Sequence, residues 1–210
     1  MKTNMLPEAQ EQALWHQFKA GDRTAFTRLM QCFYRDLFQY ATKFTKNGEF
    51  IKDCLQDLFL ELWKNRATLG ETRHVKAYLL KALRHKVYRE LYRNQKHIHH
   101  ELSEEEYCFD VVFSVEQLLI REQELLHTTE KLSALLNQLP RRQKEIIYLR
   151  FFQELEVEQI VQVMDITPQS AYNLLHKAIH RLRQFWISEK EPLSVALCLC
   201  SYFYRELSQF

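Results

Sequence analysis

The segment from Leu155 to Trp186 constrains the fold most, because its apolar residues predict two helices separated by a tight turn. Asp165 stands where the chain must reverse, and aspartate tolerates the left-handed backbone conformation better than most residues. Thr167 can then cap a second helix, for which Pro168 fits the first position. The apolar stripe of the first helix consists of Val157, Ile160, Val161 and Met164. The segment therefore has the outline of a helix-turn-helix.

The second helix of this segment has one apolar and one polar face, with Ala171, Leu174, Leu175, Ala178, Ile179 and Leu182 on the apolar side. Amides and hydroxyls near its start can read base edges in a major groove, and cations further along can contact phosphates. The alternative is an ordinary helical hairpin with a solvated polar face. The candidate DNA-binding residues are Thr167, Gln169, Ser170, Tyr172, Asn173, His176, Lys177, His180 and Arg181.

The composition predicts an all-α protein, because glycine and proline are scarce while leucine, glutamate, glutamine, lysine and arginine abound. The 210 residues suffice for one or two domains, each with its own core. No stretch resembles a signal peptide or a membrane span, so we expect a soluble, cytoplasmic protein. Five cysteines without a CxxC pair favour reduced thiols over a disulfide framework or a zinc knuckle.

Charge is distributed in blocks, although the formal net charge is only +2. Residues 72–100 hold eight lysines and arginines against one acid, whereas residues 101–130 hold nine acids against one arginine. A chain with so small a net charge is not expected to bind polyanions over its whole surface. The block arrangement instead favours a modular protein that contacts anions locally.

Three helices are predicted in the first part of the chain, at residues 8–19, 22–45 and 50–64. Asp22 can cap the second helix. The outer face of the third is unusual, because Leu60 and Trp63 stand among polar residues, a pattern typical of a docking surface for another protein. The alternative is that both side chains tuck under a neighbouring loop. The candidate docking residues are Asp53, Gln56, Asp57, Leu60 and Trp63.

A fourth helix is predicted over residues 75–95, and one of its faces interleaves aromatic rings with cations. This combination suits unpaired bases, because rings stack on bases while cations hold the backbone. The alternative is a basic solvated face that carries tyrosines by chance. The candidate residues on this face are Tyr78, Lys81, Arg84, His85, Tyr88, Arg89 and Tyr92.

The residues after the fourth helix are predicted to connect two parts of the chain. The acidic stretch ELSEEEYCFD at 101–110 is expected to be flexible. Helix is expected to resume after Ser114, which has Gln117 in capping-box position, and to run to a break at Pro140. A further helix, RRQKEIIYLRFF, then leads into the helix-turn-helix.

No motif of the sequence indicates catalysis. His97, His99 and His100 invite comparison with a metal site, but no acids follow at ligand spacing, so a polar linker is the better interpretation. A Gly-rich phosphate loop, a nucleophile paired with a base and metal-ligand spacing are all lacking in the sequence. We therefore expect a protein that is not an enzyme and has no catalytic residue, metal or cofactor.

Four segments, in this order and spacing, resemble a known family: FKAGDRTAFTRLM, DCLQDLFLELW, VKAYLLKALRHKVYREL, and LNQLPRRQKEIIYLRFFQELEVEQIVQVM with DITPQSAYNLLHKAIHRLR. Together they resemble the sigma factors of bacterial RNA polymerase, specifically the two-domain extracytoplasmic-function (ECF) group. The resemblance covers roughly residues 15 to 188. The chain also resembles members from Bacteroidetes-type bacteria, which often answer to a membrane-bound anti-sigma factor.

The resemblance implies two small helical domains joined by a linker and followed by an apolar C-terminal helix. Region 2 would dock on the polymerase and capture a flipped base of the −10 element, and region 4 would read the −35 duplex. The implied partners are core RNA polymerase, promoter DNA and an anti-sigma factor, without a small-molecule substrate or a membrane span. The expected divisions are region 2 at 7–96, the linker with the start of a connecting helix at 97–130, region 4 at 131–188 and an amphipathic tail at 189–210.

The sequence departs from the family pattern in three places. Asp165 stands where the family usually has glycine, and the acidic pair that commonly precedes Gln56 is missing, although Asp53 remains. The tail after Glu189 is longer and more apolar than in typical members. Its residues predict an amphipathic helix that needs an apolar partner, either the protein's own domains or an anti-sigma factor.

Two rival functions remain open from the sequence. One is a self-sufficient helix-turn-helix regulator that binds palindromic operators as a dimer without polymerase. The other is a metal-dependent hydrolase built around the HIHH stretch. The sigma interpretation differs from both because it requires two DNA-contacting faces on separate domains.

Overall fold

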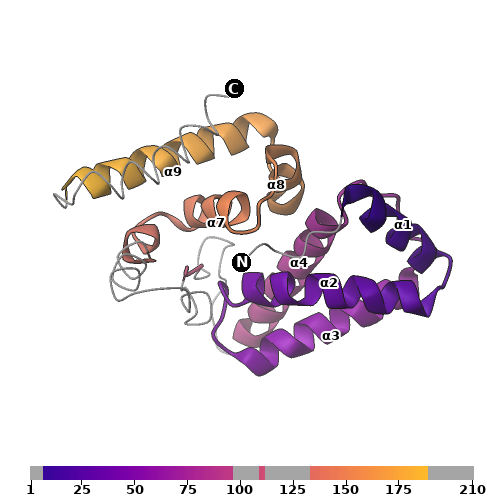
Figure 1. The fold of residues 1–210 in the computed structure, drawn as a ribbon. Coiled ribbons are helices and arrows are strands. Elements are labelled where there is room, and N and C mark those ends of the chain that lie inside the picture. Colours follow the sequence, from indigo (N-terminus) through magenta and orange to yellow (C-terminus); the bar gives the residue numbers. More distant parts are fainter. Residues whose placement is uncertain (1–6, 97–108, 112–132, 189–210) are drawn as a thin grey trace, which may run out of the picture.

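The computed structural model describes residues 7–96, 109–111 and 133–188, and each of its regular elements within these ranges is an α-helix. The all-α prediction is therefore confirmed. The helices are α1 (Glu8–Lys19), α2 (Arg23–Ala41), α3 (Gly48–Asn65), α4 (Val75–Lys96), α7 (Arg141–Phe151), α8 (Val157–Met164) and α9 (Pro168–Ser188). They form two groups, an N-terminal bundle of α1–α4 and a C-terminal bundle of α7–α9 (Figure 1).

The N-terminal bundle forms because α2 packs against α1, α3 and α4. Asp22 caps α2 as predicted, since its carboxylate accepts hydrogen bonds from the amides of Thr24 (2.7 Å) and Ala25 (3.3 Å). The helix ends at Ala41 rather than at residue 45, because the amides of Lys43 and Phe44 bond carbonyls three residues back and tighten the chain into a turn. The apolar stripe of α3 is buried, as its periodicity predicts: Ile51, Cys54, Leu55, Leu58 and Leu62.

The C-terminal bundle contains the predicted helix-turn-helix, α8 followed by α9. Both helices pack against α7, whose first residue follows Pro140. The start of α8 is held by a reciprocal capping box between Glu156 and Gln159. Asp165 follows its last residue as the C-cap and has the left-handed conformation that the sequence predicted (φ 50°, ψ 54°). The left-handed residue reverses the chain and sets the direction of α9.

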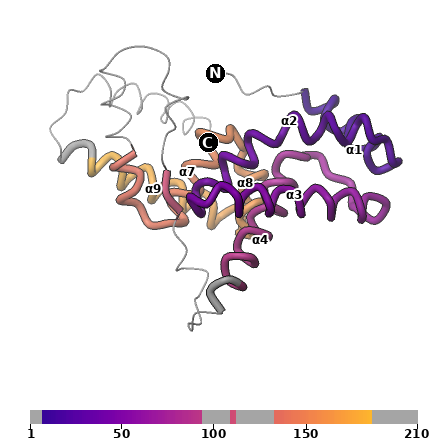
Figure 2. The backbone as a smooth tube through the Cα atoms, turned by 90° about the horizontal axis from the view of Figure 1, so that it is seen from below, coloured from indigo at the N-terminus to yellow at the C-terminus, as the bar shows by residue number. Residues whose placement is uncertain are grey.

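The two bundles touch, mainly where α4 packs against α8. Figure 2 views this arrangement from below, with α4 extending away from the rest of the N-terminal bundle. The described part of the acidic linker is packed into the junction, because Phe109 and Val111 are buried. Phe109 lies beside Tyr40 and Phe44 of the N-terminal bundle and Tyr148 of the C-terminal bundle, with ring centroids 5.1–6.2 Å apart. The prediction that residues 101–110 form a flexible connection therefore does not hold for its last two residues. Phe109 is covered by apolar surface from both bundles, and Asp110 donates its amide to the carbonyl of Lys43 (2.8 Å) and accepts from Lys144 (3.0 Å).

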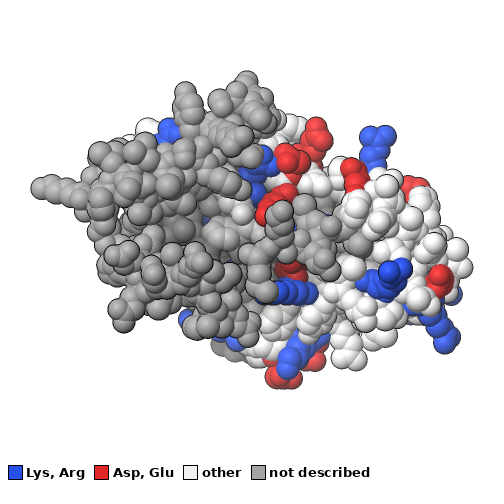
Figure 3. All heavy atoms as spheres, in the orientation of Figure 1, with Lys and Arg blue, Asp and Glu red and all other residues white. Residues whose placement is uncertain are grey.

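Several predictions fall outside the described residues: the HIHH stretch, the helix start at Ser114 and the apolar tail at 189–210. Within the described residues, no helix combines the length and apolar character needed to cross a membrane. Acidic and basic side chains are interspersed over the described part of the face in Figure 3, in keeping with the small net charge.

Candidate nucleic-acid interface

The polar face of α9 is exposed within the described residues, and one of its side chains, Arg181, also contacts Gln143 of α7 (3.5 Å). All nine candidate residues of this face, from Thr167 to Arg181, are exposed. The hydroxyl of Thr167 accepts a hydrogen bond from the amide of Ser170 (3.2 Å), so the predicted N-cap is present. Gln169 donates to Asn173 (3.2 Å), one turn along the same face. This arrangement holds two amide side chains together at the start of an exposed helix, where they can read base edges.

The aromatic and cationic face of α4 is arranged differently from the prediction. Tyr88 is only 8% exposed, because its ring packs edge-on against Phe44 at 5.2 Å. The guanidinium groups of Arg84 and Arg141 lie over the same ring, 4.7 and 4.6 Å from its centroid. Tyr78 is half-buried and contacts Trp15, and Tyr92 is half-buried as well. The expectation that three tyrosines share one open face therefore does not hold in this structure, because the bundle junction covers part of α4.

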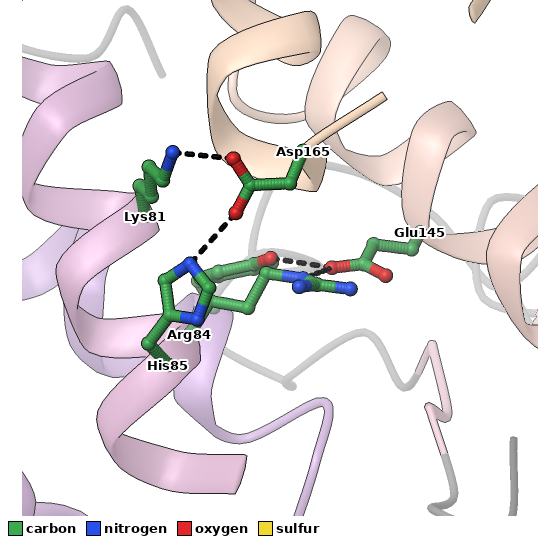
Figure 4. Close-up of polar contacts among 6 residues, drawn as sticks. Lys81, Arg84, His85, Glu145 and Asp165 are labelled. Atoms are coloured by element: carbon green, nitrogen blue, oxygen red, sulfur yellow. Dashed lines mark hydrogen bonds and ion pairs between the residues drawn. The ribbon is translucent and has the colours of Figure 1, made fainter. Parts of the chain in front are cut away.

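Glu145 lies at the centre of the covered part of α4. Its side chain is fully buried and accepts hydrogen bonds from Tyr40 Oη (2.6 Å) and Arg84 Nε (2.9 Å), so it joins α7 to both α2 and α4 (Figure 4). Burial raises the pKa of Tyr40 well above its usual value, and the nearby carboxylate of Glu145 raises it further. Tyr40 is therefore a neutral donor to a charged acceptor.

Asp165 forms a second polar link to α4, near the first in space (Figure 4). The Oδ1 atom of its carboxylate accepts a hydrogen bond from Lys81, and the Oδ2 atom lies 2.8 Å from Nε2 of His85. Burial raises the pKa of Asp165, but the hydrogen bonds from Lys81 and His85 outweigh this effect, and the pKa lies below its usual value. Three of the predicted DNA-binding residues of α4 therefore face carboxylates of the C-terminal bundle: Lys81, Arg84 and His85.

Other polar contacts extend the junction on either side of these two carboxylates. Lys76 of α4 is bonded to the carbonyl of Gln153 (2.9 Å) and pairs with Asp36 (2.8 Å). Lys43 lies over the ring of Tyr148, with Nζ 5.3 Å from the centroid. Much of the contact between the bundles is thus made by charged and polar groups.

The predicted docking face of α3 is only partly open. Leu60 is 59% exposed, and Asp53, Gln56 and Asp57 are exposed as well. Trp63 differs, because its ring packs against Phe26 at 5.1 Å and the guanidinium of Arg66 covers it at 4.5 Å. The sequence left open that Leu60 and Trp63 both pack under neighbouring residues. This alternative is correct for Trp63 and wrong for Leu60.

The sequence reasoning missed Glu145, Tyr40 and Phe109 as residues of the junction. Glu145 did carry a signal, because Tyr148 and Leu149 follow one helical turn later and both are buried. A charged residue inside an apolar stripe indicates a partner elsewhere in the chain. No group of three or more potential metal ligands was found among the described residues.

Two family models match the sequence, one on each bundle. Residues 29–97 match the family described as "Sigma-70 region 2", and residues 129–182 match "Sigma-70, region 4". Together the two models of this one family cover more than half of the chain, and they occur in the family's order. The chain belongs to the sigma-70 family. The resemblance noted from the sequence is thereby confirmed at the level of the family, and the bundles can be called region 2 (α1–α4) and region 4 (α7–α9).

Solved structures share this fold at low sequence identity. One is CnrH in complex with the cytosolic domain of CnrY, at 18% identity and a TM-score of 0.59, covering 86% of this chain and 99% of that one. Another is the sigma factor RpoE from Bartonella quintana in complex with the anti-sigma factor NepR. It has 16% identity and a TM-score of 0.56, and covers 76% of this chain and 94% of that one. No curated protein matches the sequence.

Proposed function

We propose that this sigma-70 family member is an ECF-type sigma factor, which binds core RNA polymerase and directs initiation at specific promoters. The observation that carries the proposal is the pairing of two faces suited to nucleic acid on two domains of one chain. Region 4 has an exposed helix with amides and cations on its outer face, and region 2 has a helix whose cations and aromatic rings occupy one face. A self-sufficient regulator would need only the first of these faces.

In this proposal α9 reads the −35 element and α4 captures the −10 strand. Gln169 and Asn173 are suited to base edges, whereas Lys177 is suited to phosphate. On α4, Lys81, Arg84 and Arg89 would hold the backbone while aromatic rings stack on unpaired bases. Capturing a flipped base would offset part of the cost of unstacking it.

The exposed face of α3 is the proposed polymerase-docking surface, with Leu60 as its apolar centre and Asp53, Gln56 and Asp57 around it. An anti-sigma factor is the proposed regulatory partner, because two proteins of the same fold were solved with CnrY and with the anti-sigma factor NepR. A Bacteroidetes-like origin and cytoplasmic action remain predictions.

Reconstituted transcription tests the proposal. Mixing the chain with core RNA polymerase should produce initiation from a subset of promoters, which neither component produces alone. Leu60→Ala should reduce polymerase binding, whereas the matched variant Glu49→Gln, on an exposed residue of the first turn of α3, should leave it unchanged. Operator binding as a dimer, with no effect of the chain on polymerase, would favour the self-sufficient regulator instead.

A further inference from the structure

The cationic face of α4 already has an anionic partner within the same chain. Arg84 donates a hydrogen bond to Glu145 of α7. Lys81 donates to Asp165, which follows α8, and His85 pairs with the same carboxylate. Figure 4 shows the two carboxylates approaching α4 from the region 4 side. Two successive anions along a helix face are also what a nucleic-acid backbone would present to it.

The chemistry of these contacts matches that of phosphate recognition. Guanidinium and ammonium groups bond carboxylates and phosphates through the same charge-assisted geometry. The Arg84–Glu145 pair is buried, whereas the Asp165 contacts lie near the surface, so the pairing extends from the junction to its edge. Tyr88 lies beside Arg84 under the same cover. Arg141 of region 4 also lies over this ring, whereas Phe44 packs against it from within region 2. Region 4 thereby covers part of a ring suited to stacking, together with the cations that accompany it.

The junction is built in a way that permits separation. A buried ion pair gains little net stability, because its charges are well solvated when they are released into water. Glu145 is only half satisfied, since its Oε2 atom has no hydrogen-bond partner among the described residues. Lys76 and Gln153 add further polar contacts. The junction also contains aromatic contacts, such as that between Tyr40 and Tyr148 at 6.1 Å. Its charged and polar pairs, however, can exchange their partners for water when the two domains move relative to each other.

We propose that Glu145 and Asp165 are an intramolecular mimic of DNA phosphates, so that region 4 and single-stranded nucleic acid compete for the same face of α4. In the closed arrangement, defined by the contacts of Glu145 and Asp165 with α4, Lys81, Arg84 and His85 are engaged. In the open arrangement these residues and Tyr88 become available together. This inference rests on the proposed function, in which α4 binds the −10 strand.

The test uses the full chain and a fluorescent oligo(dT) of about twelve nucleotides as the single-stranded probe. The double variant E145Q/D165N keeps the side-chain shapes and removes both negative charges. Its matched control is E49Q/E71Q, which removes two exposed charges whose partners lie in region 2: Lys52 for Glu49, and Lys19 and His16 for Glu71. Both variants raise the net charge equally, so the contribution of net charge to DNA attraction is matched.

E145Q/D165N should bind the oligonucleotide at least about tenfold more tightly than the unmodified chain, because the apparent Kd equals the intrinsic Kd divided by the open fraction. The control should change it by no more than about twofold. X-ray scattering should show a larger radius of gyration for E145Q/D165N alone. Equal affinity of the two variants would overturn the proposal.

A measurement on the unmodified chain covers the case in which the double variant does not fold. Saturating oligo(dT) should increase hydrogen exchange in α7 and at the end of α8, because the probe displaces Glu145 and Asp165. Protection of α4 by the probe without any such increase would also overturn the competition. Failure of the proposed function is distinguishable, because it would appear as absence of promoter-specific initiation with core polymerase, whatever the oligonucleotide results.

Discussion

The polar faces of α4 and α9 have similar compositions but different surroundings. All nine candidate residues of α9 are exposed, whereas on α4 only His85 and Arg89 are. The difference lies in the neighbouring elements, since α4 packs against α8 and is bonded to Glu145 of α7, whereas the outer face of α9 is exposed within the described residues. Under the proposed function, the region 4 face can therefore bind DNA in this conformation, whereas the region 2 face has to be uncovered first.

This difference suggests an order for promoter recognition under the proposed function. The −35 duplex can bind α9 without any change in the junction between the regions. The −10 strand needs Arg84 and Tyr88, which requires region 4 to move away. Any partner that binds the separated regions more tightly than the closed form would shift the chain toward the open arrangement. The size of the shift is limited by the difference between its affinities for the two forms.

The largest expected effect is on stability, and it comes from removing the contact of Glu145 with Arg84 of α4. Glu145→Ala should lower the free energy of unfolding by about 3–5 kcal/mol, because Arg84 is then left in the junction without its buried carboxylate. Urea denaturation followed by circular dichroism measures the change. The control Glu158→Ala, on an exposed residue of α8, should stay within about 0.5 kcal/mol. A loss as small for Glu145 as for Glu158 would mean that the junction contributes little to stability.

The open face of α9 can be tested independently of the junction. Asn173→Ala should weaken binding by about 1–3 kcal/mol at particular −35 positions, because a lost amide contact affects one base pair. Lys177→Ala should instead weaken binding to all sequences similarly and reduce the salt dependence. A panel of duplexes with single changes separates the two patterns. A uniform loss for Asn173→Ala would remove this residue from base reading.

Two of the three tyrosines of α4, Tyr88 and Tyr92, sharpen the comparison within region 2 itself. Tyr92→Ala should reduce −10 melting by about 1–3 kcal/mol per stacked base, measured as permanganate reactivity of unpaired thymines. Tyr88→Ala would additionally disturb the contacts with Phe44 and Arg141, so Tyr88→Phe is the better control because it keeps the ring. Unchanged reactivity in Tyr92→Ala would exclude this ring from strand capture.

The smallest expected effect is a pH dependence of the junction. Burial lowers the pKa of Lys43 to about 8 from 10.5, and opening restores the ordinary value as the side chain enters water. Between these two pKa values the closed form therefore binds fewer protons than the open form, and the closed form gains stability as pH rises. Below both pKa values Lys43 is charged in both forms, so pH has no effect there. From about pH 7.5 to 9.5 the open fraction should fall by about twentyfold. Scattering and hydrogen exchange measure this fraction.

Lys43→Met isolates the contribution of that lysine. It should flatten the pH dependence and favour the closed form near neutral pH, because methionine has no charge to desolvate. Lys46→Met, on an exposed residue nearby, is the matched control and should retain the dependence. The same slope in Lys43→Met as in the unmodified chain would assign the effect to another group.

Local signals in the sequence determined the elements and the turns between them. The apolar period of Val157, Ile160 and Met164, the cap at Thr167 and the left-handed Asp165 act within a few residues of each other, so the helix-turn-helix follows from the sequence alone. The cap at Asp22 and the buried stripe of α3 were predictable for the same reason. Periodicity also identified the polar faces of α4 and α9.

Only the tertiary structure decided which polar face meets solvent and which meets another part of the chain. Glu145 lies 61 residues from Arg84 and 105 from Tyr40 along the chain, and no local pattern records such a pairing. The helical periodicity of a sequence separates polar from apolar residues, but it does not distinguish a polar residue that will be buried from one that will meet solvent. The burial of Arg84 and Phe109 and the contact of Arg141 with Tyr88 depend on where region 4 docks, and that position is set by the summed contacts of two bundles.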